Sequence, residues 1–215
     1  TTPTGVTLNT AGGKMKVKRF AQAGVVEIVG KLTTTAGTVT SDPVTYTITR
    51  ETSQVTSVSV IAPEYIMYVP KVTKPGTQNQ VSQQFNPAKV LDQYGQEMTG
   101  QTVTWNVAND AGNSVTGVSI DNTGKLTVTN EAPGIKVYAI ATCQGVDSNN
   151  LDMTLHRDTA KDTFVKICNQ VGDAPETSLL IPTGSIPRSE DYTAKVYDQY
   201  GKEFTPDTPT WDITS

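Results

Sequence analysis

Two copies of one motif decide the fold of this chain. The first copy is DQYGQE at residues 92–97, and a strand-like TVTWNV follows it at 102–107. The second copy is DQYGKE at residues 198–203, with PTWDI after it at 209–213. The turn and the tryptophan both recur after 106 residues, so the number of residues between them is the same in the two copies. A motif that returns in this way indicates a repeated module.

The rest of the chain repeats as well. Five further pairs of segments match at intervals of 107 to 112 residues: 4–8 with 116–120, 13–17 with 124–128, 21–28 with 132–139, 47–50 with 154–157, and 55–60 with 162–167. These matches predict junctions near residues 50 and 157. The chain is therefore expected to contain the second half of one module (1–50), a complete module (51–157) and the first half of a third (158–215).

Alternating apolar and polar residues predict short strands throughout the complete module. The clearest runs are 58–60, 103–107, 125–128, 136–141 and 151–155. Gly, Asn, Asp and Pro clusters separate these runs, and DNTG at 121–124 predicts a hairpin turn. No stretch shows a sustained helical period. Seven or eight strands in about 107 residues predict an all-β chain of tandem immunoglobulin-like antiparallel β-sandwich modules.

The repeated motifs resemble a known bacterial family. The DQYG turn, the following VTW strand and GVSIDNTGKLTV at 117–128 are similar to bacterial immunoglobulin-like repeats of the group 2 type. Such repeats occur in S-layer proteins, in adhesins and as spacers in large secreted glycosidases. The resemblance covers all three segments, 85–157 best, and implies a secreted or cell-surface location (S-layer or cell wall). Because the Cys…Trp…Cys framework of antibody domains is missing, Trp105 is expected to pack on apolar side chains.

Composition narrows the class of partners. The chain has 17 Lys and Arg against 21 Asp and Glu, a net charge of −4, and its lysines are scattered. A nucleic-acid partner is therefore not expected. No run of about 18 apolar residues predicts a membrane span. The start at Thr1 carries neither an initiator Met nor a signal peptide, so a mature or excised fragment is expected.

Cysteine, histidine and tryptophan residues offer the first candidate sites. Cys143 and Cys168 fall in different modules, which favours two buried free thiols over an intramodule disulfide and leaves a bridge across the junction as the alternative. The one histidine, His156, is expected on a strand surface. Trp105 and Trp211 are expected in the core, with an exposed sugar-stacking platform as the alternative. No catalytic motif is present, and no enzymatic activity is expected.

Acidic residues of the repeated turn form the candidate metal site. They are Asp92 and Glu97 in the first copy and Asp198 and Glu203 in the second, with Asp110 and Asp121 as weaker contributors. The simplest interpretation is a tight turn, in which Gly takes a positive φ and Asp bonds the backbone. The alternative is calcium, which prefers oxygen ligands, although no EF-hand spacing is present. No other cofactor is expected.

Two functions from different classes remain. The leading hypothesis is a structural, non-catalytic spacer or assembly segment of a bacterial cell-surface, S-layer-like protein, whose partners are neighbouring modules or further copies of the chain. The alternative is a carbohydrate-binding or adhesive accessory module that binds cell-wall or other polysaccharide. The half-modules 1–50 and 158–215 carry every strand once between them, which predicts that they pair, within one chain or between two.

Overall fold

The computed structural model describes residues 2–171, 174, 189–204 and 210–214. These residues form strands and loops, with no helix among them. The described part of the chain therefore contains no helix that is long and apolar enough to cross a membrane. The all-β fold class is confirmed, and most of its small sheets are antiparallel. One departure from the prediction is the parallel pairing of β8 (Ile66–Tyr68) with β16 (Leu151–His156).

The chain divides into two compact units, each described here by itself. Unit 1 comprises Thr1–Ser59, Lys89–Thr102 and Thr142–Ser148, and unit 2 comprises Val60–Ala88, Val103–Ala141 and Asn149–Ser215. Parts of the complete module 51–157 fall in both units. The module boundaries near residues 50 and 157 therefore stay predictions from the sequence.

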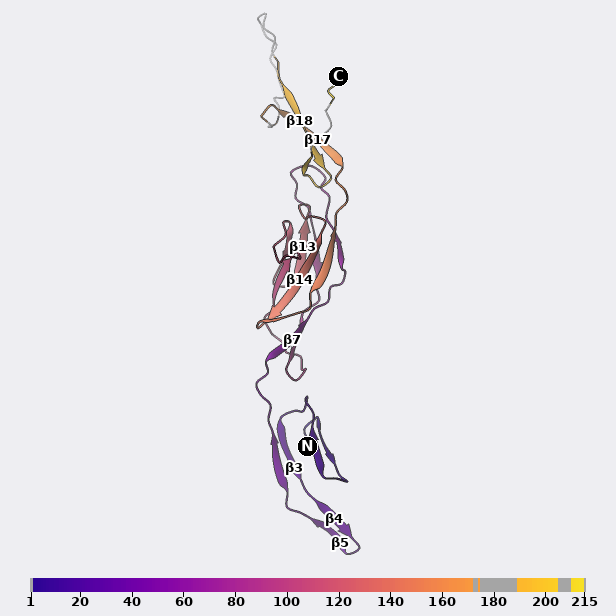
Figure 1. Cartoon of the computed structure of the whole chain (residues 1–215), viewed down its shortest axis with the longest axis vertical. Helices are drawn as coiled ribbons and strands as arrows, with labels where there is room; N and C mark the ends of the chain where they lie inside the picture. The colour runs from indigo at the N-terminus through magenta and orange to yellow at the C-terminus, as the bar shows by residue number, and fades with distance from the viewer. Residues whose placement is uncertain (1, 172–173, 175–188, 205–209, 215) are drawn as a thin grey trace, which may run out of the picture. The chain divides into compact units, whose positions relative to one another are not determined.

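Unit 1 is built from hairpins and two-stranded sheets. The pairs are β1 (Val6–Asn9) with β2 (Lys14–Val17), β3 (Gly24–Ile28) with β6 (Val44–Ile48), β4 (Lys31–Thr34) with β5 (Gly37–Thr40), and β7 (Val55–Ser59) with β10 (Lys89–Asp92). Strand β15 (Val146–Asp147) pairs with the end of β14. Val6, Ala21 and Val26 form a small core in this unit. Figure 1 labels β3, β4 and β5 in this part of the chain, and the hairpin β4–β5 was not predicted.

Unit 2 contains two sheets of the complete module and one of the third segment. Its strands are β8, β9 (Gln80–Gln84), β11 (Thr104–Ala108), β12 (Val118–Ile120), β13 (Lys125–Thr129), β14 (Lys136–Cys143), β16, β17 (Asp162–Asn169), β18 (Tyr192–Asp198) and β19 (Glu203–Phe204). The sheet orders are β11-β14-β16-β8, β12-β13-β9 and β17-β18-β19. Leu126, Val137, Met153 and Leu155 from these strands are almost wholly buried, as the alternating pattern predicts.

Segments that match in sequence also pair with their neighbouring strands in the same register. In the complete module Val137 pairs with Met153, and in the first segment their counterparts Val26 and Tyr46 pair in the same way. The hairpins β1–β2 and β12–β13 likewise share one register. Sheet register is specified by which side chains face the core. Equal register therefore shows that the matched segments are the same element, folded twice.

The third segment repeats the beginning of the complete module, including an irregularity. Val58 pairs with Val90 in β7–β10, and the counterparts Val165 and Val196 pair in β17–β18. In both pairs the register shifts at the strand end next to the DQYG turn. A bulge at a fixed place re-aims the residues beyond it. The bulge therefore gives both DQYG turns the same position relative to the strand before them.

The two tryptophans differ from the prediction in their burial. Trp105 is half-buried, its ring lies 5.6 Å from that of Phe85, and a Cβ on Gly124 would approach the indole to 2.8 Å. Its expected packing on apolar groups is confirmed. Trp211 was predicted to be a core strand residue, and this is wrong, because it lies outside any strand and is 53 % exposed. It keeps an aromatic neighbour, Tyr192, at 6.4 Å.

The physical reason for the exposure of Trp211 is the missing cover on its other face. In the complete module Gly124, in the turn of the β12–β13 hairpin, lies against Trp105. The described residues of the third segment include no counterpart of that hairpin. The predicted strand also includes Pro209, which is outside the described residues. An aromatic ring that packs on one face alone stays partly exposed.

Candidate functional site: a side-chain clamp on the linker

The repeated turn is held by its own aspartate. Asp92 Oδ1 accepts hydrogen bonds from the backbone N–H of Tyr94 at 2.9 Å and of Gln96 at 2.8 Å. Gly95, at φ 77°, completes the turn, and its N–H bonds the Asp92 carbonyl at 2.9 Å. The positive φ explains the glycine at this position. The second copy repeats these bonds from Tyr200 and Lys202 to Asp198, with Gly201 at φ 80°.

The next residue, glutamine, binds the backbone of the segment that links one module to the next. We call residues 51–54 and 158–161 the first and second linkers. Gln93 Oε1 accepts a hydrogen bond from the N–H of Gln54 at 2.7 Å, and its Nε2 donates to the carbonyl of Thr52 at 2.9 Å. One side-chain amide thus satisfies a donor and an acceptor of the linker backbone.

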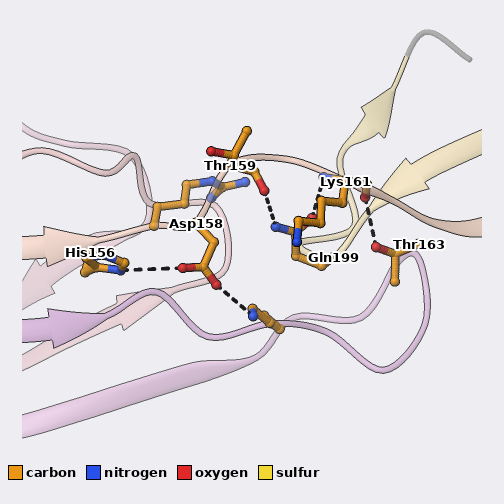
Figure 2. Close-up of a pocket in the computed structure, with 8 residues that line it drawn as sticks. His156, Asp158, Thr159, Lys161, Thr163 and Gln199 are labelled. Carbon is orange, nitrogen blue, oxygen red and sulfur yellow. Dashed lines mark hydrogen bonds and ion pairs between the residues drawn. The ribbon is translucent and has the colours of Figure 1, made fainter.

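The second linker is bound in the same way. Gln199 Oε1 accepts from the N–H of Lys161 at 2.8 Å, and Nε2 donates to the Thr159 carbonyl at 2.8 Å. Figure 2 shows the Gln199 side chain between these two residues, with dashed lines to both. Gln199 is buried, whereas Gln93 is half-buried. Equal geometry in two copies indicates that the contact belongs to the repeat.

The tyrosine of the turn adds a hydrogen bond and a cation–π contact. The Tyr94 hydroxyl accepts from the N–H of Glu51 at 2.9 Å, and the Arg50 guanidinium lies 4.2 Å from the ring centroid. In the second copy, Tyr200 accepts from Asp158 at 2.8 Å under the guanidinium of Arg157 at 3.8 Å. Arg50 follows β6 and Arg157 follows β16, so the stacking ties the segment after each strand to the next turn.

We call Asp, Gln and Tyr of each turn together the turn clamp. The first turn clamp consists of Asp92, Gln93 and Tyr94, and the second of Asp198, Gln199 and Tyr200. Most of their bonds to the linkers go to backbone groups, so the clamp does not depend on linker side chains. What it requires is a linker of fixed length and an arginine at its start. Both are repeated in the sequence, at residues 50–54 and 157–161.

The two clamps differ in how the aspartate uses its second oxygen. Asp92 Oδ2 accepts a hydrogen bond from the Ser53 hydroxyl at 2.9 Å. Burial acts to raise the pKa of Asp92, but the hydrogen bonds from Gln96, Ser53 and Tyr94, with the charge of Arg50, lower it overall. The counterpart of Ser53 is Ala160, which has no hydroxyl, and Asp198 Oδ2 instead lies 3.7 Å from an Arg157 nitrogen.

The second clamp is the more deeply buried and the better bonded. Arg157 donates hydrogen bonds to the carbonyls of Asn130 and Ala132, both at 2.8 Å. The Asn130 amide donates to the Tyr200 carbonyl at 2.8 Å. In the first clamp, Arg19 donates to the Gln93 carbonyl at 2.7 Å, but Arg50 Nε and Nη2 have no partner among the described residues. Buried donors without partners are costly, so the first junction should be the weaker one.

A small charged cluster lies beside the second linker. Lys71 Nζ is 2.8 Å from Asp158 Oδ2, and this hydrogen bond and its charge lower the pKa of Asp158 and raise that of Lys71. His156 Nδ1 lies 3.7 Å from Asp158 Oδ1, as Figure 2 shows. The His156 side chain is exposed at the end of β16, which confirms its predicted surface position. All three side chains are open to solvent, so the cluster contributes little to stability.

The four proposed calcium ligands lie in or beside the two DQYG turns, where the aspartates are buried and the glutamates are exposed. The Asp92 and Asp198 carboxylates are buried and accept the bonds described above. Glu97 is exposed beside Leu91, and Glu203 is exposed with Oε2 3.7 Å from Lys195 Nζ. Asp121 Oδ1 is bonded within its own hairpin turn, and Asp110 is exposed. No group of three such side chains that could hold a metal occurs in the described ranges. Calcium stays an untested prediction.

Cys143 and Cys168 are both buried and unbridged. The preferred sequence interpretation, two buried free thiols, is thereby confirmed. Both behave as small apolar side chains in strands β14 and β17.

The sequence predicted the turn but not the contacts that its side chains make with the linker. The roles of Gln93 and Gln199 and of the two arginines were missed. One signal for them existed, because Arg50 and Arg157 recur in matched segments just as the DQYG turns do. A residue pair that repeats together at a distance is a candidate contact.

The comparisons with known proteins add two solved structures. No protein-family model matches the sequence, and no curated protein matches it. The Escherichia coli adhesin FdeC is similar over 83 % of this chain and 52 % of its own, with 14 % identity and a TM-score of 0.28. The surface layer protein SbsC, domains 1–6, is similar over 95 % of this chain and 27 % of its own, with 18 % identity and a TM-score of 0.24.

The chain thus spans about half of the FdeC structure and about a quarter of that of SbsC. TM-scores this low do not by themselves establish a shared fold. The modular all-β description rests instead on the strands and on the register they repeat.

Proposed function

We propose that this chain is a non-catalytic run of structural modules, a spacer or assembly segment of a bacterial cell-surface protein. The observation that carries the proposal is the turn clamp, which is built twice with the same bonds to the linker backbone. A linker held on both its donors and acceptors loses conformational freedom. Holding successive modules in a fixed relation is what a spacer or an assembly segment requires.

The cell-surface location rests on the sequence. The DQYG turn, the VTW strand and the hairpin at 117–128 resemble bacterial immunoglobulin-like repeats, which serve in surface proteins. The partners proposed for the chain are neighbouring modules and further copies of itself. No nucleic-acid partner is proposed, because the charge is −4 with no basic stripe.

The proposal is tested by measuring the distance between spin labels on either side of the second linker. Lys125 on β13 and Lys166 on β17 are both exposed and suit labelling after change to Cys, with Cys143 and Cys168 first replaced by Ala. A rigid junction gives a narrow distance distribution, which broadens in Gln199→Ala. The matched control is Gln78→Ala, at an exposed glutamine outside the linker. A broad distribution in the chain with an intact clamp would contradict the proposal.

A carbohydrate-binding role remains the second candidate, favoured by the exposed pair Tyr192 and Trp211. Aromatic rings that stack on sugars must be exposed. The repeat offers another explanation for Trp211, because its counterpart Trp105 packs against Phe85 in the complete module. Binding of the chain to a glycan array, lost in Trp211→Ala, would favour the carbohydrate role over the structural one.

A further inference from the structure

A cleft lies beside the second linker in unit 2. The side chains that line it include Lys71, His156, Asp158, Lys161 and Gln199, and it encloses about 620 Å³ (Figure 2). This volume is in the range of a small-molecule site. His156 comes from β16 and Lys161 from the second linker, so both sides of the junction contribute to it. We call it the linker cleft.

The linker cleft carries an excess of positive charge. Among the described residues, Asp158 is the one carboxylate that lines it, and Lys71 Nζ lies 2.8 Å from this carboxylate. The ion pairs of the described residues do not include Lys161, so its ammonium group is available to a ligand. His156 adds a further charge when it is protonated. Because the whole chain has a net charge of −4, this cleft is a local site that attracts anions.

The turn clamp does not require these charges. The first junction has Thr49 and Gln54 where the second has His156 and Lys161. Both clamps bond the backbone N–H at the last linker position, so the side chain there is free to differ. The structural role of the repeat therefore leaves the two cationic side chains of the second junction unexplained.

The cleft is open for a reason that a whole module shares. Thr52, Gln54 and Thr56 are the counterparts of three residues that line the cleft. All three are exposed, although the module that contains them is complete. The exposure of this segment therefore belongs to the repeat and does not depend on how much of a module follows the linker.

An exposed aromatic ring lies next to the cleft. Tyr68 on β8 pairs in register with His156 on β16, so the two side chains lie on the same face of the sheet. Their ring centroids are 5.1 Å apart, and Tyr68 is 66 % exposed. An exposed tyrosine offers a flat apolar ring with a polar tip, which suits the apolar face and the hydroxyl groups of a sugar.

We propose that the linker cleft binds an acidic sugar unit of a polysaccharide. The sugar ring stacks on Tyr68, and its carboxylate binds Lys161 and Lys71. Lys71 can serve both Asp158 and the ligand, because an ammonium group has three donors. An open cleft admits a unit within a polymer, whereas a closed pocket would admit only its end. This inference goes beyond the proposed structural function, since a junction can be rigid while the cleft is empty.

The test measures binding of the full chain to polygalacturonate, a polymer of acidic sugar units, by titration calorimetry at constant ionic strength. Neutral dextran should not bind, and inorganic polyphosphate should bind more weakly. Lys161→Gln should weaken polygalacturonate binding about tenfold, through the loss of one hydrogen bond to a charged group. The fold tolerates this change, because the first linker has glutamine at this position. Tyr68→Ala should weaken binding of polygalacturonate but not of polyphosphate.

Lys125→Gln is the matched control, because it removes the same charge from an exposed lysine on β13 and should leave binding unchanged. Absence of polygalacturonate binding overturns the proposal, as does equal weakening by Lys125→Gln and Lys161→Gln. Equal binding of polyphosphate with no effect of Tyr68→Ala also overturns it, because the cleft would then recognise charge alone. Loss of binding in Trp211→Ala would place the glycan elsewhere and has the same consequence. The label-distance test of the second linker uses no glycan, so its outcome is separate.

Discussion

The Tyr200 hydroxyl accepts a 2.8 Å hydrogen bond from the backbone N–H of Asp158. The Tyr94 hydroxyl makes the equivalent bond to Glu51 at 2.9 Å. In each case a tyrosine of the DQYG turn reaches back to the first residue of the linker before it.

Removing the Tyr200 hydroxyl should destabilise unit 2. Tyr200→Phe keeps the ring and its contact with Arg157 but leaves the Asp158 N–H without its partner. The expected loss is about 0.5–1.5 kcal/mol of unfolding free energy, the usual net contribution of one intramolecular hydrogen bond. Denaturant unfolding measures it. Tyr68→Phe, at an exposed tyrosine, should change stability by less than about 0.5 kcal/mol. Equal effects of the two changes would show that the hydroxyl contributes nothing.

The two arginines should differ in their response to lysine. Arg157 stacks on Tyr200 and donates to two carbonyls, so Arg157→Lys should cost about 2 kcal/mol. Arg50 stacks on Tyr94 but has two nitrogens without partners in the described structure, so Arg50→Lys should cost less than about 1 kcal/mol. Chemical unfolding of both variants gives the comparison, and a larger cost for Arg50→Lys would contradict the assigned order.

The first clamp should weaken in acid. The pKa of Asp92 is lowered in the folded chain, since its hydrogen bonds and Arg50 outweigh the effect of burial. A lowered pKa contributes stability above the unfolded value of about 3.9, and this contribution is lost as the pH falls through the folded pKa. Carboxyl NMR titration should place the Asp92 midpoint below the unfolded value of about 3.9. Ser53→Ala should raise the Asp92 midpoint, and a midpoint at or above about 3.9 in the unchanged chain would refute this.

Trp105 should matter more than Trp211. Trp105→Ala removes the ring that packs on Phe85 and Gly124. The expected loss is about 3 kcal/mol of unfolding free energy. This value is at the lower end of the range for truncating a large aromatic side chain, because the ring is half-buried. Trp211→Ala should cost less than about 1 kcal/mol, because the side chain is exposed. Thermal unfolding compares the two. A small effect at Trp105 would reopen the sugar-platform interpretation for the complete module.

Chelation tests the calcium hypothesis directly. The Asp92 and Asp198 carboxylates are already bonded to the turn, so excess chelator at constant ionic strength should leave the melting temperature unchanged. An ion bound only to the folded state would stabilise it, and removing the ion would lower the melting temperature. A clear drop on chelation, restored by added calcium, would establish a site that includes these carboxylates.

The strands were largely predictable because their cause is local. Alternation in 125–128, 136–141 and 151–155 reflects one face turned to a core, and these strands occur as expected. The β4–β5 hairpin was missed, because residues 32–40 fall outside the segments that match between modules. The burial of Trp211 was mispredicted because burial depends on covering segments, which a repeated motif alone does not supply.

The contacts of the turn clamp were not predicted, for a different reason. Asp and Gly identify the turn from the sequence, since they act on their own backbone. Gln93 and Gln199 act on a linker about 40 residues earlier, and no local pattern encodes such a contact. The glutamines repeat together with Arg50 and Arg157, and this joint repetition is the sequence signal that the turn contacts the linker.

The central claim, that the turn clamp holds the linker, is tested most directly by hydrogen exchange at the N–H of Lys161. This donor bonds Gln199 Oε1 at 2.8 Å, although Lys161 itself is exposed and lies just before β17. The account predicts a slowly exchanging Lys161 N–H in the unchanged chain and fast exchange in Gln199→Ala, with β13 amides unaffected. Exchange at Lys161 that is equally fast with and without the Gln199 side chain would contradict it.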